Sequence, residues 1–530
     1  MMKSLVNMKS VISEWFQSHK STLTYCLATT FLWGLVAHAY GLLHNNLSHD
    51  VLNAFVATTT EEIWKIELGR FFVPVYRYLF RGAVSLPWLI GLVGLFWISL
   101  AVFFMIQLLD VKKKPVIALI AGIMVTNITY ISQIATYVYE FDFNALALLL
   151  AVLAVYLWRK AGRWSGLIGG VLCLLISISI YQAYFAVAPT LMIWLILTDL
   201  FDEQPVKAVL RRGVTGLGML VLALLLYFVV GKIVYAATGI EPQARVDVFQ
   251  AGNIVSLLMS YAGLIWPCLR NLGDSIFHTA YSRGLLMILV QLAVGSLAVG
   301  AVLMMSRKRF PLWRVLWILV LVLILPFGMN CIYFIAGGVG VHDLMSYAAW
   351  FFYVFLLVFA LRLGDVTQVP MGLRRIVKWA AYGLVAFVLV QNVTIANTAY
   401  VKKELDANAT LSTMTRMVDQ LEQRDDYVPG ETPVAFVGAD PVSAAVEGFE
   451  DVRSITGMWM DSSIPADTSV YYYNVYEAYF RYVLKYPMNI CSDEVHGKLK
   501  ADPVVAEMPS FPEKGYIKCV DGVLVVKMGE

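Results

Sequence analysis

Eleven long apolar runs fill the first three quarters of this chain and constrain its fold more than any other feature. A transmembrane helix needs about 20 consecutive, mostly apolar residues to cross the hydrocarbon core of a bilayer. The runs approach or exceed that length, and 59% of the 530 residues are hydrophobic, which is too apolar for a soluble chain of this size. The sequence therefore predicts a polytopic α-helical membrane protein with about eleven transmembrane helices. The predicted spans are 21–43, 86–109, 115–134, 143–159, 166–181, 184–200, 213–235, 284–305, 313–335, 346–363 and 377–398.

Basic residues predict how these helices cross the membrane. Cytoplasmic loops carry an excess of Lys and Arg, and the basic clusters fall in alternate connections only if the chain crosses eleven times. The spans 166–181 and 184–200 could form one long tilted helix, but this parity favours two. The first span starts too late for a signal peptide, so we expect a cytoplasmic N-terminus and an external C-terminus. The clusters are Lys112 to Lys114, Arg159 with Lys160 and Arg163, Lys207 with Arg211 and Arg212, Arg307 to Arg309, and Arg374 with Arg375 and Lys378.

The last 130 or so residues differ in composition from the rest, with ordinary charge density and frequent Pro and Gly. We therefore expect a transmembrane domain over 1–398 and a small soluble α/β domain over 399–530. A helix is predicted at 400–424, with an apolar stripe of Leu405, Leu411, Met414, Met417, Val418 and Leu421. A buried strand is predicted at 433–438, and Asp521-Gly522 is typical of a two-residue hairpin turn between strands 516–520 and 523–528.

Two function classes are disfavoured by composition and motifs. The net charge is only +3 and the cations lie in short clusters between apolar runs, so nucleic-acid binding is not expected. No Gly-rich phosphate loop is present, which disfavours a nucleotide-sugar donor. Cys491 and Cys519 both lie in the soluble domain, where an oxidising compartment would allow a disulfide, but sequence alone does not decide whether they pair.

Ionisable residues are concentrated in the external loops 44–85, 135–142 and 236–283. Between the first two spans lie Asp50, Glu61, Glu62, Glu67 and Arg70. Charged groups so close to lipid are costly and are commonly retained for function. The simpler interpretation is that Glu61, Glu62 and Glu67 mark the water interface and cap helix ends. For Asp50 we favour a functional role, because a lone carboxylate can accept a proton from an attacking hydroxyl.

The second acidic site is Glu140-Phe141-Asp142, between the third and fourth spans. Carboxylates two residues apart in an extended turn can both approach one cation or one sugar. We therefore favour a substrate-binding role or a divalent metal, Mg²⁺ or Mn²⁺, for Glu140 and Asp142. His342-Asp343, in a short loop before the tenth span, could bind acceptor sugar or phosphate, or could be a helix-capping pair.

These features together resemble the GT-C glycosyltransferases, which take sugars from polyprenyl phosphates. The shared features are an outward-facing loop with an Asp soon after span one, an acidic ExD motif between spans three and four, and a soluble C-terminal domain. Other motifs resemble the type II glucosyltransferase family, bacterial enzymes that modify O-antigen and convert serotype. Those motifs are Leu68-Gly69-Arg70, Tyr181-Gln182-Ala183, Met508 to Tyr516, and Asp521 to Lys527.

The resemblance implies an inverting hexosyltransferase of the bacterial inner membrane. Glucose on a polyprenyl phosphate would be transferred, on the periplasmic face, to a hydroxyl of a lipid-linked O-antigen repeat or a related surface polysaccharide. Such an enzyme depends on a flippase and on a polyprenyl-phosphate glucosyl synthase to supply its donor. In this assignment Asp50 is the catalytic base, and Arg70 and Arg77 bind the donor phosphate because guanidinium grips phosphate in bidentate fashion. Weaker candidates for acceptor binding are Glu61, Glu62, Gln182, His342 and Asp343.

Two other classes stay open at this point. An O-antigen polymerase also has large external loops, but it has no need for an acid so soon after the first span. A flippase-type transporter would place ionisable residues near the bilayer centre and often shows a repeated half. No cofactor is required by the sequence. Many members of the resembled family carry paired acids where this chain has His49-Asp50, and this departure bears on the assignment of Asp50 as the base.

Overall fold

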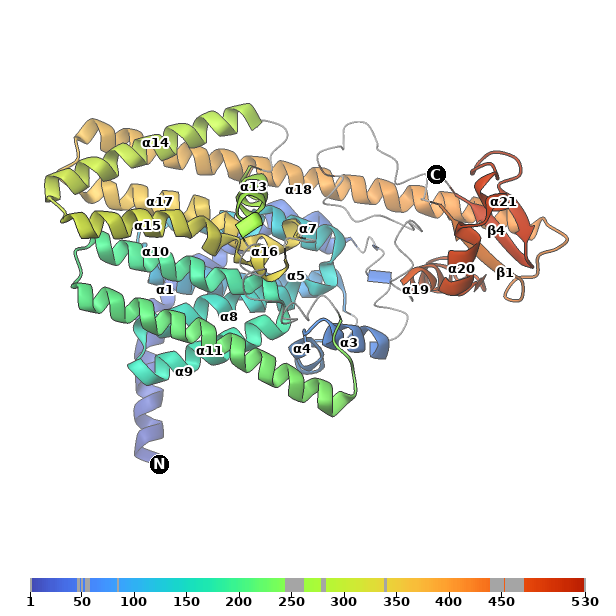
Figure 1. The fold of residues 1–530 in the computed structure, drawn as a ribbon, viewed down its shortest axis with the longest axis horizontal. Helices are drawn as coiled ribbons and strands as arrows, with labels where there is room; N and C mark the ends of the chain where they lie inside the picture. Colours follow the sequence, from blue (N-terminus) through green and yellow to red (C-terminus); the bar gives the residue numbers. More distant parts are fainter. Residues whose placement is uncertain are drawn as a thin grey trace.

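Long helices align along one axis to form a bundle, and a small α/β domain lies beyond one end of it (Figure 1). The structure is a computed structural model. It describes residues 2–44, 48, 51–52, 58–82, 85–243, 262–277, 283–337, 341–438, 452 and 471–528.

Twelve helices build the bundle. Within the described residues, nine helical segments are long and apolar enough to cross a membrane, α6 and α7 together make a tenth span bent by 41°, and Trp164–Ile180 of α9 is a shorter apolar helix. All eleven predicted spans fall on these segments, so the polytopic α-helical fold is confirmed. The helices are α1 (Met2–Leu43), α5 (Pro87–Leu108), α6 (Lys114–Thr126), α7 (Ile128–Thr136), α8 (Phe141–Lys160), α9 (Arg163–Ile180), α10 (Val187–Phe201), α11 (Val206–Thr238), α14 (Arg283–Lys308), α15 (Leu312–Met329), α17 (Phe351–Asp365) and α18 (Met371–Glu422).

Short elements connect these helices. They are α3 (Thr58–Glu67), α4 (Phe72–Phe80), η1 (Val138–Glu140), η2 (Gln182–Ala186), α13 (Ile265–Ile276), α16 (Cys331–Ile335), η4 (Asp343–Met345) and η5 (Tyr347–Trp350). The break between α9 and α10 is sharp, because Tyr181 is extended, with φ −156° and ψ 116°, and η2 follows it. Residues 166–200 therefore form two helices that run in opposite directions, as the charge parity predicted (Figure 1).

The five basic connections gather at one end of the bundle, here called the basic end. Ion pairs tie these connections together: Lys113 Nζ is 3.6 Å from Asp365, Arg362 is 3.0 Å from Asp202, and Lys308 is 3.4 Å from Glu203. The C-terminal domain lies beyond the opposite end, here called the site end (Figure 1). The alternation of charge in the sequence therefore corresponds to two chemically different ends of the bundle.

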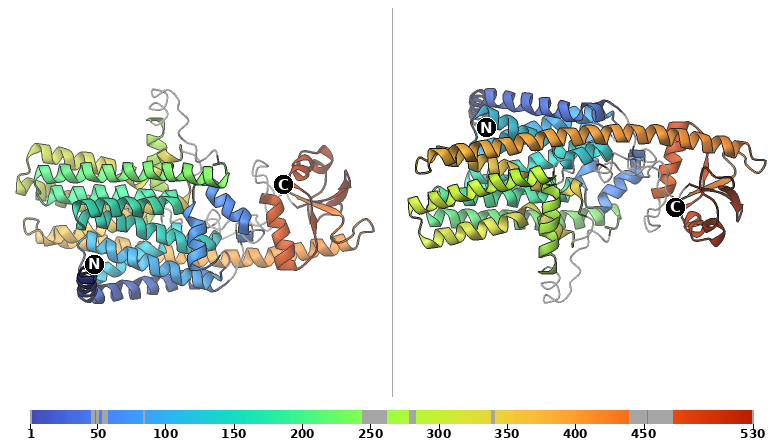
Figure 2. Two further views of the ribbon diagram at one scale, coloured as in Figure 1. Left: turned by 90° about the horizontal axis from the view of Figure 1, so that it is seen from below. Right: turned by 90° about the horizontal axis from the view of Figure 1, so that it is seen from above.

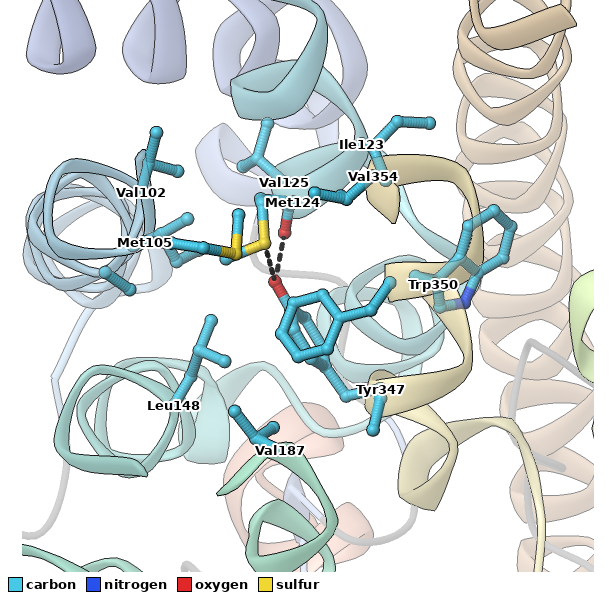
Figure 3. Close-up of a cluster of buried hydrophobic side chains, with 14 of the residues drawn as sticks. Val102, Met105, Ile123, Met124, Val125, Leu148, Val187, Tyr347, Trp350 and Val354 are labelled. Atoms are coloured by element: carbon cyan, nitrogen blue, oxygen red, sulfur yellow. Dashed lines mark hydrogen bonds between the residues drawn. The ribbon is translucent and has the colours of Figure 1, made fainter. Parts of the chain in front are cut away.

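The core of the bundle lies where α5, α6, α8, α10, η5 and α17 meet (Figure 3). Tyr347 and Trp350 fill it with almost no exposed surface, and the Tyr347 hydroxyl donates to the Met124 backbone oxygen at 2.7 Å. A buried hydroxyl needs such a partner to offset its lost hydration. By contrast, α11, α14 and α15 turn large apolar side chains outward; for example, Val214 and Leu323 are each 70% exposed. Those helices provide the lipid-facing surface.

The C-terminal domain contains a four-stranded sheet in the order β2-β1-β4-β3. Strand β1 (Pro433–Val437) pairs in parallel with β2 (Asn489–Ile490) and β4 (Val523–Lys527), and β3 (Ile517–Val520) is antiparallel to β4. The hairpin prediction is confirmed: Asp521 and Gly522 both have positive φ, 51° and 78°. Helices α19 (Tyr471–Ala478), α20 (Asp493–Lys500) and α21 (Pro503–Ala506), with the π-helical turn η8 (Tyr479–Leu484), complete the domain.

The predicted last span and the predicted helix at 400–424 are one continuous helix, α18 (Figure 2). Lys402 and Asp406 form an i,i+4 ion pair at 2.5 Å, which supports the helix beyond the apolar stretch. The predicted stripe is only partly correct. Met414, Met417 and Leu421 are fully buried in the domain, whereas Leu405 and Leu411 are 51% and 43% exposed.

The two cysteines of the C-terminal domain do not pair. Cys491 is buried between α20 and the sheet, whereas Cys519 is exposed on the edge strand β3. The disulfide that the sequence left open is absent from the structure, and both thiols are free.

Candidate active site

Seven charged side chains from three short stretches meet at the site end of the bundle. We call them the charged cluster: Glu61 and Lys65 from α3, Arg70 from the following turn, Arg77 and Arg81 at α4, Glu140 from η1 and Asp142 from α8. The structure thus brings both predicted acidic loops into a single site, although the residues involved are up to 81 positions apart.

Glu61 and Glu140 share the buried ammonium of Lys65. Lys65 donates to Glu140 Oε1 and lies 3.3 Å from Glu61 Oε1, and its side chain is only 1% exposed. Arg77 then grips Glu61 in bidentate fashion, with Nη2 3.1 Å from Oε1 and Nη1 on Oε2. Burial would raise the pKa of Glu61, but the nearby charges of Lys65 and Arg77 outweigh it and hold that pKa below its usual value. Glu61 therefore stays ionised as a structural counter-ion.

Asp142 forms a separate pair with Arg81. Arg81 Nε donates to Asp142 Oδ2 at 2.7 Å, and Nη2 donates to Oδ1 at 3.2 Å. The Tyr76 hydroxyl also donates to Asp142 at 3.0 Å, and burial followed by the Asp142 charge raises the pKa of Tyr76. Asp142 is fully buried, so this network fixes α4 against the first turn of α8.

Arg70 is the cation of the cluster that is least neutralised. Its Nη1 is 3.4 Å from Glu140, whose other oxygen is bound to Lys65, and its guanidinium lies over the Tyr181 ring, 4.4 Å from the centroid. Its Nε is buried without a hydrogen-bond partner, while 15% of the side chain is exposed. Four cations face three carboxylates in the cluster. The excess positive charge therefore falls on a guanidinium with donors to spare, which is suited to an anion.

The backbone that carries Arg70 is held by a glycine and two side chains. Gly69 adopts φ +73°, and a Cβ there would collide with the Tyr227 hydroxyl. Tyr227 donates to the Gly69 oxygen at 3.1 Å, and Gln182 Nε2 donates to the Leu68 oxygen at 2.7 Å and to the Tyr227 hydroxyl at 2.9 Å. The Leu68-Gly69-Arg70 motif and the Tyr181-Gln182 turn are thus joined, through Tyr227, in one hydrogen-bond network that positions Arg70.

Several predicted site residues occupy other positions. Asp50 lies outside the described residues, as does His49, although Ser48 donates to the Thr136 backbone oxygen at 2.5 Å next to the cluster. Glu62 is half-buried on α3. Arg77 is 3% exposed and committed to Glu61, so its guanidinium lies beneath the site and is not open to a phosphate. His342 is exposed and Asp343 half-buried near α7, where the Asp343 backbone oxygen accepts from Thr129 at 2.7 Å.

The ExD motif does not have the geometry that its spacing predicted. Glu140 and Asp142 lie on a continuous helical turn, not an extended one, and each binds a different cation. Within the described part of the chain, no group of three His, Cys, Asp or Glu side chains is arranged to hold a metal ion. As placed, Glu140 and Asp142 do not fit a shared divalent cation.

Lys65 of the cluster and Tyr76, which donates to Asp142, were not singled out from the sequence. Lys65 follows Glu61 by four residues, the spacing of a helical ion pair, which is a signal that could have identified it. Tyr76 carried no such signal, because its partner Asp142 is 66 residues away.

Comparison with known proteins identifies a family whose model covers these helices and the charged cluster. The family model "Glucosyl transferase GtrII" matches residues 39–361. These residues include the whole charged cluster and the hydrogen-bond network of Gly69, Gln182 and Tyr227. Comparisons with curated proteins and with solved structures gave no match. The match covers well over half of the chain, and this membrane protein therefore belongs to the GtrII glucosyl transferase family.

Proposed function

We propose that this protein transfers glucose from a polyprenyl-phosphate donor to a hydroxyl of a lipid-linked O-antigen repeat or a related surface polysaccharide. The reaction would take place at the site end, which we assign to the periplasmic face of a bacterial inner membrane. The basic end is then cytoplasmic, as the excess of Lys and Arg in its connections favours. Family membership supports the glucosyl transfer, and the charged cluster supports the nature of the donor.

The observation that carries this proposal is the state of Arg70. The donor's leaving group is a lipid phosphate, and charge grows on its bridging oxygen as the bond to glucose C1 breaks. A guanidinium with a spare buried Nε–H and a partly exposed face can stabilise that charge at the membrane surface. Lys65, Arg77 and Arg81 are each paired with a carboxylate. Arg77 also has a buried Nε without a partner, but its side chain is only 4% exposed, against 15% for Arg70.

The bond changes are those of a single inverting displacement. The acceptor oxygen attacks glucose C1 from the face opposite the phosphate, the C1–O bond to phosphate breaks, and the electron pair leaves with the polyprenyl phosphate. A carboxylate must take the acceptor proton, and we assign that role to Asp50. Support comes from one described neighbour: Ser48 donates to the backbone oxygen of Thr136 at the end of α7, four residues before Glu140 in the chain. The proposed displacement uses no divalent cation, and transfer is expected to persist in chelator.

The direct test uses membranes that contain the protein, a lipid-linked acceptor and polyprenyl-phosphate [¹⁴C]glucose. We expect label to move to the acceptor only when the protein is present, and nucleotide-linked glucose to give no transfer in washed membranes. Use of the nucleotide sugar alone would refute the donor assignment. Chain extension of the acceptor without added glucose would favour an O-antigen polymerase, and label crossing the membrane without transfer would favour a flippase.

The orientation can be tested with the native cysteines. Cys519 is exposed in the C-terminal domain, whereas Cys26, Cys268 and Cys491 are buried. A membrane-impermeant maleimide should therefore label intact cells with a permeabilised outer membrane at Cys519, and a Cys519→Ser variant should lose that label. Labelling of Cys519 only after the inner membrane is opened would invert the topology and remove the periplasmic assignment.

A further inference from the structure

An open cavity with polar and apolar lining lies at the basic end, far along the bundle from the charged cluster. It opens between the first membrane span and the start of α6 and has a volume of about 520 Å³. Its lining consists of Gln17, Lys20, Ser21, Thr24, Tyr25 and Ala28 of α1 together with Lys114 of α6. The glucosyl transfer proposed above gives these residues no role.

The two lysines in this cavity differ from their neighbours. Lys112 is 3.3 Å from Asp110 and Lys113 is 3.6 Å from Asp365, so both have carboxylate partners. Lys114 turns instead toward the cavity, with Nζ 5.6 Å from the Tyr25 ring centroid. Among the described residues no carboxylate pairs with Lys114 or Lys20. The cavity therefore presents two uncompensated ammonium groups beside the hydroxyls of Ser21 and Thr24.

An exposed apolar track leads from this cavity toward the membrane interior. Beyond Thr24 and Ala28, the same side of α1 carries Leu32, 62% exposed, and Val36, 51% exposed, at a spacing of four residues. Residues four apart lie above one another on one helix face. The cavity and the apolar track are thus continuous, with the polar side chains of the cavity at the end of the span and the apolar track within it.

We propose that this cavity binds an anionic glycerophospholipid of the leaflet at the basic end. Its phosphate would lie between Lys20 and Lys114, its glycerol and headgroup oxygens would bond Ser21, Thr24 and Gln17, and one acyl chain would follow Ala28, Leu32 and Val36. Basic pockets between transmembrane helices on the cytoplasmic side are suited to such headgroups. A free phosphate would use the same two lysines but has no need of the apolar track.

The test is native mass spectrometry of the full-length protein with added phosphatidylglycerol or phosphatidylcholine. The cavity variant combines Lys20→Gln with Lys114→Gln, and its matched control combines Lys112→Gln with Lys113→Gln, which removes the same charge from the same end. We expect the wild type and the control to prefer phosphatidylglycerol, and the cavity variant to bind it about tenfold or more weakly. Equal losses in the two double variants would refute the cavity, because net charge alone would then explain binding.

A third variant separates a lipid from a free phosphate. Ala28→Trp should block the apolar track at an exposed position without removing charge, so it should weaken phosphatidylglycerol binding by several-fold. If Ala28→Trp binds like wild type, or if millimolar inorganic phosphate displaces the lipid completely, the site is a phosphate site and the lipid assignment is wrong. Each purified variant should keep the elution volume of the folded protein.

Discussion

Tyr227 on α11 donates its hydroxyl to the backbone oxygen of Gly69, 158 residues earlier in the chain, at 3.1 Å. This hydrogen bond joins a lipid-facing helix to the turn that carries Arg70. Because Gln182 bonds both the Tyr227 hydroxyl and the Leu68 oxygen, the position of Arg70 depends on three separate segments of the bundle.

Gly69→Ala should therefore impair transfer more than stability. The added Cβ collides with the Tyr227 hydroxyl, and the alanine must adopt φ +73°. We therefore expect Arg70 to shift and glucosyl transfer to fall by about tenfold or more. Gly82→Ala is a matched control, since Gly82 has the same φ of +73° and no described atom within 4 Å of its Cβ position. Both variants should lose about 1 kcal/mol of stability from the left-handed backbone, and Gly69→Ala should lose somewhat more because the Tyr227 hydroxyl must move. Equal activity of the two would show that Gly69 does not position Arg70.

Arg70→Lys keeps the charge but removes the planar fork. We expect transfer to fall by about tenfold or more, with little change in melting temperature, because the single ion pair of Arg70 with Glu140 is long at 3.4 Å. Arg416→Lys is the control, since Arg416 also stacks on an aromatic ring, 4.9 Å from the Phe511 centroid, but lies in the C-terminal domain. Full activity of Arg70→Lys in the labelled-donor assay would assign the phosphate to another group.

In contrast to Arg70→Lys, Arg77→Met should mainly lower the stability of the protein. It leaves the buried Glu61 carboxylate with Lys65 alone, and breaking a buried pair costs about 3 kcal/mol. The comparison is Arg362→Met, which breaks an exposed pair with Asp202 and should cost less than about 1 kcal/mol. Thermal unfolding in detergent measures both. If Arg77→Met melts like wild type but no longer binds the donor, Arg77 is a phosphate ligand after all.

Asp50→Asn preserves shape and cannot accept a proton, so we expect transfer to fall by about 100-fold or more. Glu62→Gln is the natural comparison, because Glu61 is held by two cations whereas Glu62, its half-buried neighbour on α3, has room to act. Normal kinetics for Asp50→Asn together with a defect in Glu62→Gln would move the base to Glu62.

The C-terminal domain should lose stability in acid through His496. Burial lowers the pKa of His496 to about 4, from an ordinary value of 6.5, and its Nε2 lies 3.0 Å from the Phe436 oxygen. Between these two pKa values the unfolded chain binds the proton and the folded domain does not, so stability falls as pH drops from about 6.5 to about 4, by about 1–3 kcal/mol in total. Thiol labelling of buried Cys491, normalised to exposed Cys519, can follow domain opening. His496→Gln should flatten this pH dependence, and an unchanged slope would exclude His496.

The spans and the hairpin were predictable because their signals are local. A bilayer fixes the length of an apolar run, and a two-residue hairpin turn needs positive φ at residues such as Asp521 and Gly522. The continuity of α18 was missed because Lys402, Lys403 and Glu404 end the apolar run, although charged residues continue a helix readily once it leaves the bilayer.

The three carboxylates of the charged cluster were found from the sequence, but their partners were not. Glu140 pairs with Lys65 across 75 positions and Asp142 pairs with Arg81 across 61, and only the packing of α3 and α4 on α8 brings them together. For the same reason, spacing alone suggested a joint cation for Glu140 and Asp142, whereas helical backbone turns them toward different arginines and lysines.

Because α18 is one continuous helix of 52 residues, it sets both the distance of the C-terminal domain from the bundle and the rotation of that domain about the helix axis. At about 1.5 Å and 100° per residue, each residue added to a helix lifts whatever follows by a small step and swings it by more than a quarter turn. Met414, Met417 and Leu421 of the same helix form part of the domain core. The domain is therefore packed directly onto α18 and turns with it. The face that it presents to the site end is thus set by the exact count of residues between the membrane and Met414.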